Sequence, residues 1–283
     1  MHYVEARGLT VPSLGFGLFK VDGDSARDAV VDALAIGYRL LDTAQRYGNE
    51  ADIGRGITAS SVPRDEYLLS TKLALELDAR GTIEATKQSL RRLKTDYLDL
   101  LLMHWPNVDV PIEETLLAMM ELHESGLVRA IGVSNFTSAQ VREALKVAPI
   151  VTDQVEYHPF LAQPTLLATA RQEDLVLMAY SPLARGAVSS DPVLLDIASM
   201  HGKNPAQIAL RWLVEQDRVA TIPKSASSER RRSNFDIFDF ELSREDTERI
   251  NALARGLRLV NPNIAPEWDD QDGAEATKGN QAP

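Results

Sequence analysis

The chain has 283 residues, of which 44% are hydrophobic and 25% are charged, as expected for a globular protein with one barrel-sized domain. No stretch approaches the ~18 apolar residues that a membrane-spanning helix needs, so we expect no membrane partner. The net charge of −11 argues against nucleic acid as a partner, because proteins that bind duplexes are usually basic. The absence of cysteine and of an apolar or basic leader favours the cytoplasm.

Short apolar segments alternate with segments of helical periodicity along nearly the whole chain. Eight apolar segments are predicted to be strands: residues 14–19, 39–44, 67–72, 97–104, 128–135, 150–154, 175–181 and 219–225. Helical patterns lie between them, for example at 25–37, 82–93, 112–126 and 205–216. Eight strands alternating with about eight helices predict the α/β class and, within it, a closed (β/α)8 TIM barrel.

The main structural alternative is an open, doubly wound sheet, which shows the same alternation. It is disfavoured because the first strand lacks the G-x-G-x-x-G pattern and carries only Gly15 and Gly17. No linker or change in composition divides the chain, so a single domain is predicted over residues 1–273, with a short N-terminal extension and a C-terminal loop. Residues 274–283 have no apolar side chain larger than alanine and are expected to form a disordered tail.

Polar residues gather where the predicted strands end, which is where (β/α)8 barrels carry their catalytic groups. The ends of the second to eighth strands carry Asp42, Lys72, His104, Ser134 with Asn135, Gln154, Tyr180 with Ser181, and Lys224 with Ser225. Tyr47 follows the second strand after a short loop. Each residue alone is more often a helix cap, a solvated charge or a structural residue. Their occurrence at seven consecutive strands favours a shared functional site at this rim.

Four of these residues suit the reduction of a carbonyl group. A nicotinamide cofactor would supply the hydride, because no side chain donates one. Tyr47 could supply the proton if Lys72 lowered the pKa of its phenol, which is ordinarily near ~10. Asp42 would hold the Lys72 ammonium in place. His104 would orient and polarise the carbonyl oxygen.

The chain resembles the aldo-keto reductase family over almost its whole length. The segments that carry the resemblance are LGFGLFK (14–20), LLDTAQRYGNE (40–50), TKL (71–73), LLLMHWP (100–106), IGVSNF (131–136), QVEYHP (154–159), YSPL (180–183) and IPKS (222–225). Within the family, the bacterial 2,5-diketo-D-gluconate reductases are most similar, and segments 93–106 and 258–269 favour their B-type branch. Phe19 and Ala74 stand where many relatives have tryptophan, which implies an open pocket.

The resemblance implies a catalytic tetrad and a binding site for NADPH. The tetrad would be Asp42, Tyr47, Lys72 and His104. Ser134, Asn135 and Gln154 would hold the carboxamide of the cofactor, and Tyr180 would stack under its nicotinamide ring. Further cofactor contacts are expected at Leu18, Phe19, Asp42, Ser181, Leu183 and Asn234. Substrate contacts are expected at Phe19, Tyr47, His104, Trp105 and Trp268, although Trp268 could instead hold the C-terminal segment to the barrel.

The segment after the eighth strand has the features of a phosphate site. Lys224 and Ser225 end the strand, and Ser227 can cap the next helix, whose free N–H groups attract anions. Arg230 lies in the first turn of this helix, where it would pair with a 2′-phosphate and favour NADPH over NADH. The two arginines that follow are expected to form a solvated face.

Two other functions stay open on sequence grounds. The barrel could bind its cofactor as a sensor, resembling the potassium-channel β subunits, but a channel-interaction extension is absent. A Schiff-base aldolase that uses Lys72 is disfavoured by Asp42, because such lysines are usually unpaired. The histidines show no metal-binding spacing, so no metal is expected. The substrate is left open among 2,5-diketo-D-gluconate, methylglyoxal and β-keto esters, and a monomer is expected.

Overall fold

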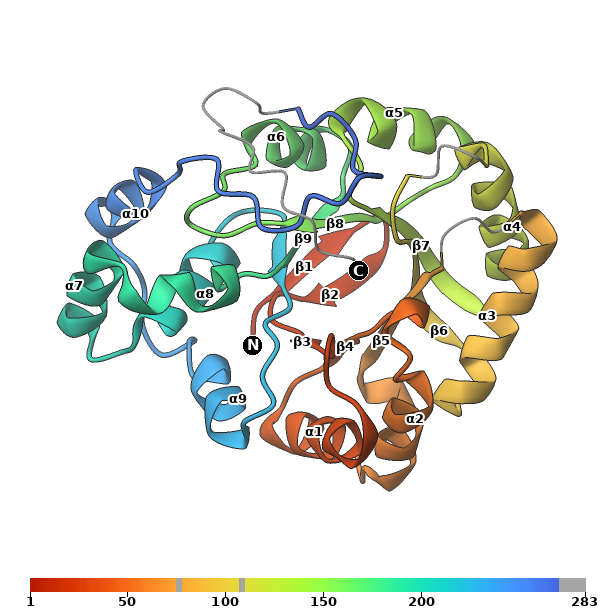
Figure 1. Ribbon diagram of the computed structural model, residues 1–283, viewed down its shortest axis with the longest axis horizontal. Helices are drawn as coiled ribbons and strands as arrows, with labels where there is room; N and C mark the ends of the chain where they lie inside the picture. Colours follow the sequence, from red (N-terminus) through yellow and green to blue (C-terminus); the bar gives the residue numbers. More distant parts are fainter. Residues whose placement is uncertain (75–77, 107–109, 270–283) are drawn as a thin grey trace.

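The computed structural model describes residues 1–74, 78–106 and 110–269, which form a ring of helices around a barrel of strands (Figure 1). The tail expected at 274–283 lies outside the described residues, as do the last residues of the predicted domain. No helix in the described ranges is both long enough and apolar enough to cross a membrane.

In these ranges, eight parallel strands form the barrel in chain order. They are β3 (Phe16–Gly17), β4 (Leu40–Asp42), β5 (Leu68–Leu73), β6 (Leu98–Met103), β7 (Val128–Ser134), β8 (Thr152–Glu156), β9 (Val176–Tyr180) and β10 (Val219–Thr221). A parallel bridge between Leu14 and Thr221 joins the two ends of the sheet, and the Gly15 N–H donates to the Thr221 carbonyl at 2.8 Å. The barrel is therefore closed, and the predicted (β/α)8 fold is confirmed.

The two glycines of the first barrel strand allow this closure. A Cβ atom on Gly15 would lie 2.6 Å from Cδ2 of Leu40, and one on Gly17 would lie 2.8 Å from the carbonyl oxygen of Ile222. At Gly15 the Leu40 side chain of β4 would have to shift, whereas at Gly17 the obstacle is backbone that cannot easily move. Gly17 thus allows the close approach of β3 to the segment that follows β10.

Helices cover the outside of the barrel (Figure 1). The described residues contain α1 (Gly23–Ile36), α2 (Glu50–Ala59), α3 (Ala79–Leu93), α4 (Ile112–Glu124), α5 (Ser138–Val147), α6 (Pro164–Gln172), α7 (Pro192–His201), α8 (Pro205–Val214), α9 (Ser228–Phe235) and α10 (Arg244–Asn251). Short 3-10 turns form η1 (Gln45–Tyr47), η2 (Arg64–Glu66) and η3 (Ala184–Ser190). Two helices, α7 and α8, lie between β9 and β10, and α10 follows α9, so the fold exceeds the single helix per strand expected from the sequence.

An N-terminal hairpin closes the end of the barrel where the strands begin. Its strands β1 (Tyr3–Ala6) and β2 (Leu9–Pro12) pair antiparallel, and they are seen through the barrel in Figure 1. Ala6 and Val11 are buried in one cluster with interior side chains such as Leu40 and Leu100. Sequence analysis identified only an extension here. The hairpin leaves the opposite end of the barrel as the open face for a site.

Candidate active site

A buried ion pair lies at the carboxyl ends of β4 and β5. Lys72 Nζ is 2.6 Å from Asp42 Oδ2 and donates to the Thr43 carbonyl at 2.9 Å. Asp42 and Lys72 are 2% and 1% exposed, so each charge depends on the other. Burial is the largest single influence and lowers the pKa of Lys72, but the charge of Asp42, the Tyr47 phenol and the hydrogen bonds to both together outweigh burial and raise the pKa overall. The Lys72 side chain therefore stays charged at neutral pH.

The Tyr47 hydroxyl lies beside this ammonium. Its oxygen is 3.5 Å from Lys72 Nζ, and its ring packs between Phe19 at 4.9 Å and His104 at 5.8 Å, measured between ring centres. Burial raises the pKa of Tyr47 above its ordinary value, and the Lys72 charge only partly opposes this rise. The expectation that Lys72 would bring this pKa below its ordinary value is therefore wrong for this structure, because desolvation of the phenolate dominates. The phenol keeps its proton through the neutral range.

The His104 imidazole follows β6 and has unused hydrogen-bonding capacity. Its ring makes no hydrogen bond to the described residues, and Nδ1 is buried. Burial, with the nearby charges of Lys72 and Arg46, holds the pKa of His104 well below its usual range, so the ring is neutral. The His104 carbonyl accepts from Asn135 Nδ2 at 2.9 Å, which fixes the backbone at this point. A neutral imidazole on this fixed backbone can bind a carbonyl oxygen without adding charge.

The residues expected to hold the nicotinamide form one network with this pair. Gln154 Nε2 donates to Asp42 Oδ1 at 2.9 Å, and Ser134 Oγ donates to the Gln154 carbonyl at 2.7 Å. Asn135 Nδ2 donates to Ser134 Oγ at 3.0 Å, and the Tyr180 hydroxyl donates to Asn135 Oδ1 at 2.8 Å. The left-handed backbone of Asn135, with φ of 64°, turns the chain at the end of β7. A hydroxyl, two amides and an aromatic ring beside the tetrad fit a carboxamide-bearing ring such as nicotinamide.

The remaining residues expected near the nicotinamide lie at the same end. Leu18 is fully buried, and its N–H donates to the Asp42 carbonyl at 2.9 Å. Phe19 follows it and is 43% exposed, which leaves its ring open to the pocket. Ser181 and Leu183 lie in the loop between β9 and η3, and Ser181 has a φ of 50°.

The start of α9 presents free cations, as the phosphate hypothesis requires. Ser227 caps the helix and accepts from the Arg230 N–H at 3.4 Å. The side chains of Lys224 and Arg230 are exposed and make no ion pair within the described ranges. Ser225 and Asn234 are buried on the same segment. This arrangement fits the phosphate of a nucleotide cofactor.

Arg231 does not form a solvated face, contrary to expectation. It is 5% exposed, and its Nε lies 2.7 Å from Asp32 Oδ2. Its Nη1 donates to the carbonyls of Ser225 and Ala226 at 3.1 and 3.0 Å. Arg231 therefore fixes the loop that carries the expected phosphate ligands, whereas the exposed Arg232 pairs with Asp32 at 3.2 Å.

Two tryptophans meet at the mouth of the barrel. The rings of Trp105 and Trp268 contact each other edge to face at 6.2 Å between ring centres. Trp268 Nε1 also donates to Asn261 Oδ1 at 3.1 Å, and the Arg258 guanidinium stacks on the indole at 3.8 Å. Trp268 thus both holds its own loop and reaches the expected substrate wall.

Sequence analysis missed the role of Glu156 in placing this C-terminal loop. The Glu156 carboxylate is fully buried and accepts from the N–H groups of Leu259 and Val260, both at 2.8 Å. His158 Nε2 lies 3.0 Å from the same carboxylate. The Glu-x-His-Pro segment was the available signal, but its partner lies more than 100 residues away.

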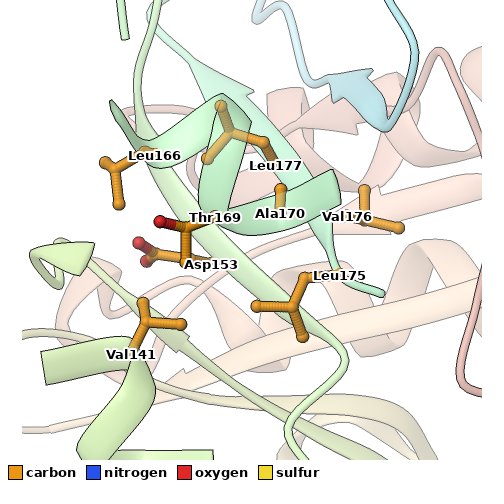
Figure 2. Close-up of a pocket in the computed structure, with 8 residues that line it drawn as sticks. All are labelled: Val141, Asp153, Leu166, Thr169, Ala170, Leu175, Val176 and Leu177. Atoms are coloured by element: carbon orange, nitrogen blue, oxygen red, sulfur yellow. The ribbon is translucent and has the colours of Figure 1, made fainter. Parts of the chain in front are cut away.

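A small cavity lies apart from these residues, between the barrel and helices α5 and α6 (Figure 2). Its lining residues are Val141, Asp153, Leu166, Thr169, Ala170, Leu175, Val176 and Leu177. Burial raises the pKa of Asp153 well above its usual range, and its Oδ2 has no hydrogen-bond partner in the described structure. No tetrad residue lines this cavity, so it is not the substrate pocket. The described residues contain no group of three or more acidic or histidine side chains placed to hold a metal ion.

Comparison with known proteins identifies the family. The aldo/keto reductase family model matches residues 13–255, and the chain belongs to this family. It is 39% identical over 268 residues to methylglyoxal reductase DkgB of Escherichia coli O157:H7, covering 92% of this chain and 100% of that protein. It is 44% identical over 260 residues to glyoxal reductase of Bacillus subtilis strain 168, covering 90% and 93%.

Solved structures agree with this assignment. A crystal structure provisionally described as 2,5-diketo-D-gluconic acid reductase B shares 45% identity, with a TM-score of 0.94 and coverage of 95% of this chain and 98% of that one. Aldose reductase of Schistosoma japonicum shares 30% identity, with a TM-score of 0.89 and coverage of 95% and 100%. The resemblance inferred from the motifs is confirmed, and the chain is an oxidoreductase of the carbonyl-reducing class.

Proposed function

We propose that the protein is an NADPH-dependent reductase of small aldehydes and ketones in which Tyr47 donates the proton. One observation carries the proposal: the Tyr47 hydroxyl lies 3.5 Å from an ammonium that is itself held 2.6 Å from Asp42. Beside it stands the His104 ring, which has no internal hydrogen bond to the described residues. Tyr47 and His104 can therefore donate hydrogen bonds to the oxygen of a bound carbonyl compound.

The roles of the side chains follow from their charges. The nicotinamide cofactor supplies the hydride when bound. Tyr47, kept protonated by burial, transfers its proton to the oxygen of the reduced carbonyl group. Lys72 stabilises the phenolate that this transfer leaves, and Asp42 keeps Lys72 charged and in position. His104, neutral at pH 7, donates a hydrogen bond that orients the carbonyl oxygen before the transfer.

The cofactor specificity depends on the start of α9. Lys224 and Arg230 are free cations at a capped helix N-terminus, and both suit a 2′-phosphate, which NADPH has and NADH lacks. Ser225 and Asn234 complete this end of the site. Ser134, Asn135, Gln154 and Tyr180 would hold the nicotinamide end, with Leu18, Phe19, Asp42, Ser181 and Leu183 around it.

The residues at the mouth of the barrel support small carbonyl substrates. Phe19, Trp105 and Trp268 would form the walls of the substrate site beside Tyr47 and His104, and Phe19 is partly exposed. Methylglyoxal, 2,5-diketo-D-gluconate and β-keto esters are the substrates that we propose for testing. Because one chain assembles the whole site and has no cysteine, we propose a monomeric, cytoplasmic enzyme.

The test is a steady-state assay of carbonyl reduction with NADPH and NADH over these substrates. We expect turnover of at least one α-dicarbonyl compound, with a lower KM for NADPH than for NADH. Tight binding of NADPH without turnover of any carbonyl compound would favour a cofactor sensor instead. Irreversible labelling of Lys72 by borohydride and a carbonyl compound, without cofactor, would favour Schiff-base chemistry.

A further inference from the structure

Arg46 lies beside the proposed proton donor but has no part in the mechanism above. It is the middle residue of η1, between Gln45 and Tyr47. The Gln45 side chain is fixed, because its Nε2 donates to Ser89 Oγ at 3.0 Å and its Oε1 accepts from the Ala74 N–H at 2.7 Å. Successive side chains of a 3-10 turn point about 120° apart. Arg46 therefore points away from both neighbours, and it is exposed.

The Arg46 guanidinium is an exposed charge next to Tyr47 in the chain. It makes no ion pair or hydrogen bond within the described part of the chain. By contrast, exposed Arg55 on the following helix pairs with Asp24 at 3.1 Å and Asp52 at 3.2 Å. After burial, the charge of Arg46 is one of the causes that hold the pKa of His104 low. The guanidinium thus lies near enough to His104 for its charge to act on the imidazole.

Two further cations lie on this rim, although the chain as a whole has a net charge of −11. Lys20 Nζ lies 5.2 Å from the ring centre of Phe19. The Arg258 guanidinium stacks on Trp268. Asp269, an acid at the end of the same C-terminal loop, is engaged elsewhere, because its carboxylate accepts from the Ser138 N–H at 2.7 Å. Lys20 and Arg258 thus add positive charge to the described rim, on which Glu267, next to Trp268, is an exposed acid.

We propose that Arg46 forms a carboxylate-binding subsite, so that the enzyme selects carbonyl substrates that also carry a carboxylate over neutral ones. The inference rests on the proposed function and specifies its substrate class. A guanidinium binds a carboxylate through two parallel hydrogen bonds, and Arg46 need not leave an internal partner to do so. A charge-assisted contact of this kind should be worth about tenfold in kcat/KM.

The experiment compares carboxylate substrates with neutral compounds of the same shape. The substrates are 3- and 4-formylbenzoate and the corresponding formylbenzamides, each reduced with NADPH. The variants are Arg46→Ile, Arg46→Gln and Arg46→Lys. Arg91→Ala is the matched control, since Arg91 is an exposed arginine in the last turn of α3, at the other end of the barrel. The readout is the ratio of kcat/KM for each acid to that for its amide, which does not depend on the fraction of folded enzyme.

We expect wild-type enzyme and Arg91→Ala to prefer at least one acid, and Arg46→Ile and Arg46→Gln to lose about tenfold of this preference while retaining amide reduction. Arg46→Lys should keep part of it. The wild-type preference should also fall as salt increases, because salt screens the charge. Equal ratios in all proteins, with both substrates reduced, would overturn the subsite alone. Failure of wild-type enzyme to reduce any of the four compounds would overturn the proposed function.

Discussion

At each end of the barrel a buried carboxylate is paired with cationic side chains: Asp42, where the strands end, with Lys72, and Asp99, where β6 begins, with Arg64 and Arg129. Asp99 Oδ2 accepts from Arg64 Nη2 at 2.6 Å and from the Leu69 N–H at 2.9 Å, and its Oδ1 accepts from Arg129 Nη1 at 3.0 Å. Asp42 accepts from Lys72 and Gln154. The two acids are similarly buried, at 5% and 2% exposure, so burial does not tell them apart.

The two sites differ in the other contacts that their cations, Arg64 and Lys72, make. Arg64 also donates to Thr95 Oγ1 and to the carbonyls of Tyr67 and Tyr97, so four of its five N–H groups are engaged within the protein. The third contact of Lys72 is a long one, 3.5 Å, to the Tyr47 hydroxyl, and the neighbouring His104 Nδ1 has no hydrogen-bond partner among the described residues. The cluster around Asp99 uses its hydrogen bonds within the protein and stabilises the fold. The cluster around Asp42 leaves hydrogen-bonding groups of Tyr47 and His104 that can act on a ligand.

Replacement of Lys72 by methionine should have the largest effect on activity. The phenolate left by Tyr47 would lose its stabilising charge, and kcat should fall about 100- to 10,000-fold. Asp42 would also lose its ion-pair partner, so the protein should be less stable. Single-turnover reduction of an aldehyde, corrected for folded protein by circular dichroism, measures the effect. A kcat within threefold of wild type would show that Lys72 serves stability alone.

Replacement of Arg64 by methionine should lower stability and leave activity unchanged. It removes one cation from buried Asp99, and we expect a loss of about 3 kcal/mol in the free energy of unfolding, measured by urea titration. The kcat per folded molecule should not change, because the cluster lies at the far end of the barrel. A loss of kcat comparable to that of Lys72→Met would contradict the division of roles between the two ends.

Replacement of Arg230 by alanine should raise the KM for NADPH about ten- to a hundredfold and leave the KM for NADH nearly unchanged. The physical reason is loss of a charge-assisted contact to the 2′-phosphate. Arg232→Ala is the control, because Arg232 lies on the same helix and pairs with Asp32. Equal losses with both cofactors would show that Arg230 does not bind the phosphate.

The smallest expected effect is that of pH near neutrality. The pKa of His104 is lowered and that of Tyr47 is raised, so neither group changes protonation between about pH 6.5 and 9. The rate of the chemical step should therefore stay level over this range and decline only at more acidic or more alkaline pH. A clear step near pH 6.5 that vanishes in His104→Gln would show that the imidazole titrates.

The alternation of apolar and helical segments was enough to predict the barrel and the residues at its strand ends. Alternation predicted the strands, and because the carboxyl ends of parallel strands meet, it also predicted that Asp42, Lys72 and His104 would lie together. The N-terminal hairpin was missed, because its two strands have only four residues each and their apolar partners lie on other strands.

Long-range contacts were beyond reach of the sequence patterns. Arg231 looked solvated because its partner, Asp32, is 199 residues away. The link from Glu156 to the C-terminal loop spans a similar gap in the chain. The sign of the pKa shift of Tyr47 depends on how deeply the phenol is buried, which no sequence pattern reports.

Tyr47→Phe tests the central claim most directly, because the change removes one oxygen and leaves the packing of the ring intact. The measurement is single-turnover reduction of an aldehyde, with NADPH binding followed by fluorescence titration. We predict a loss of about 100- to 10,000-fold in the rate of the chemical step, with the Kd for NADPH changed less than about threefold. A variant that retains more than about a tenth of the wild-type rate would mean that the proton comes from another group, with His104 the next candidate.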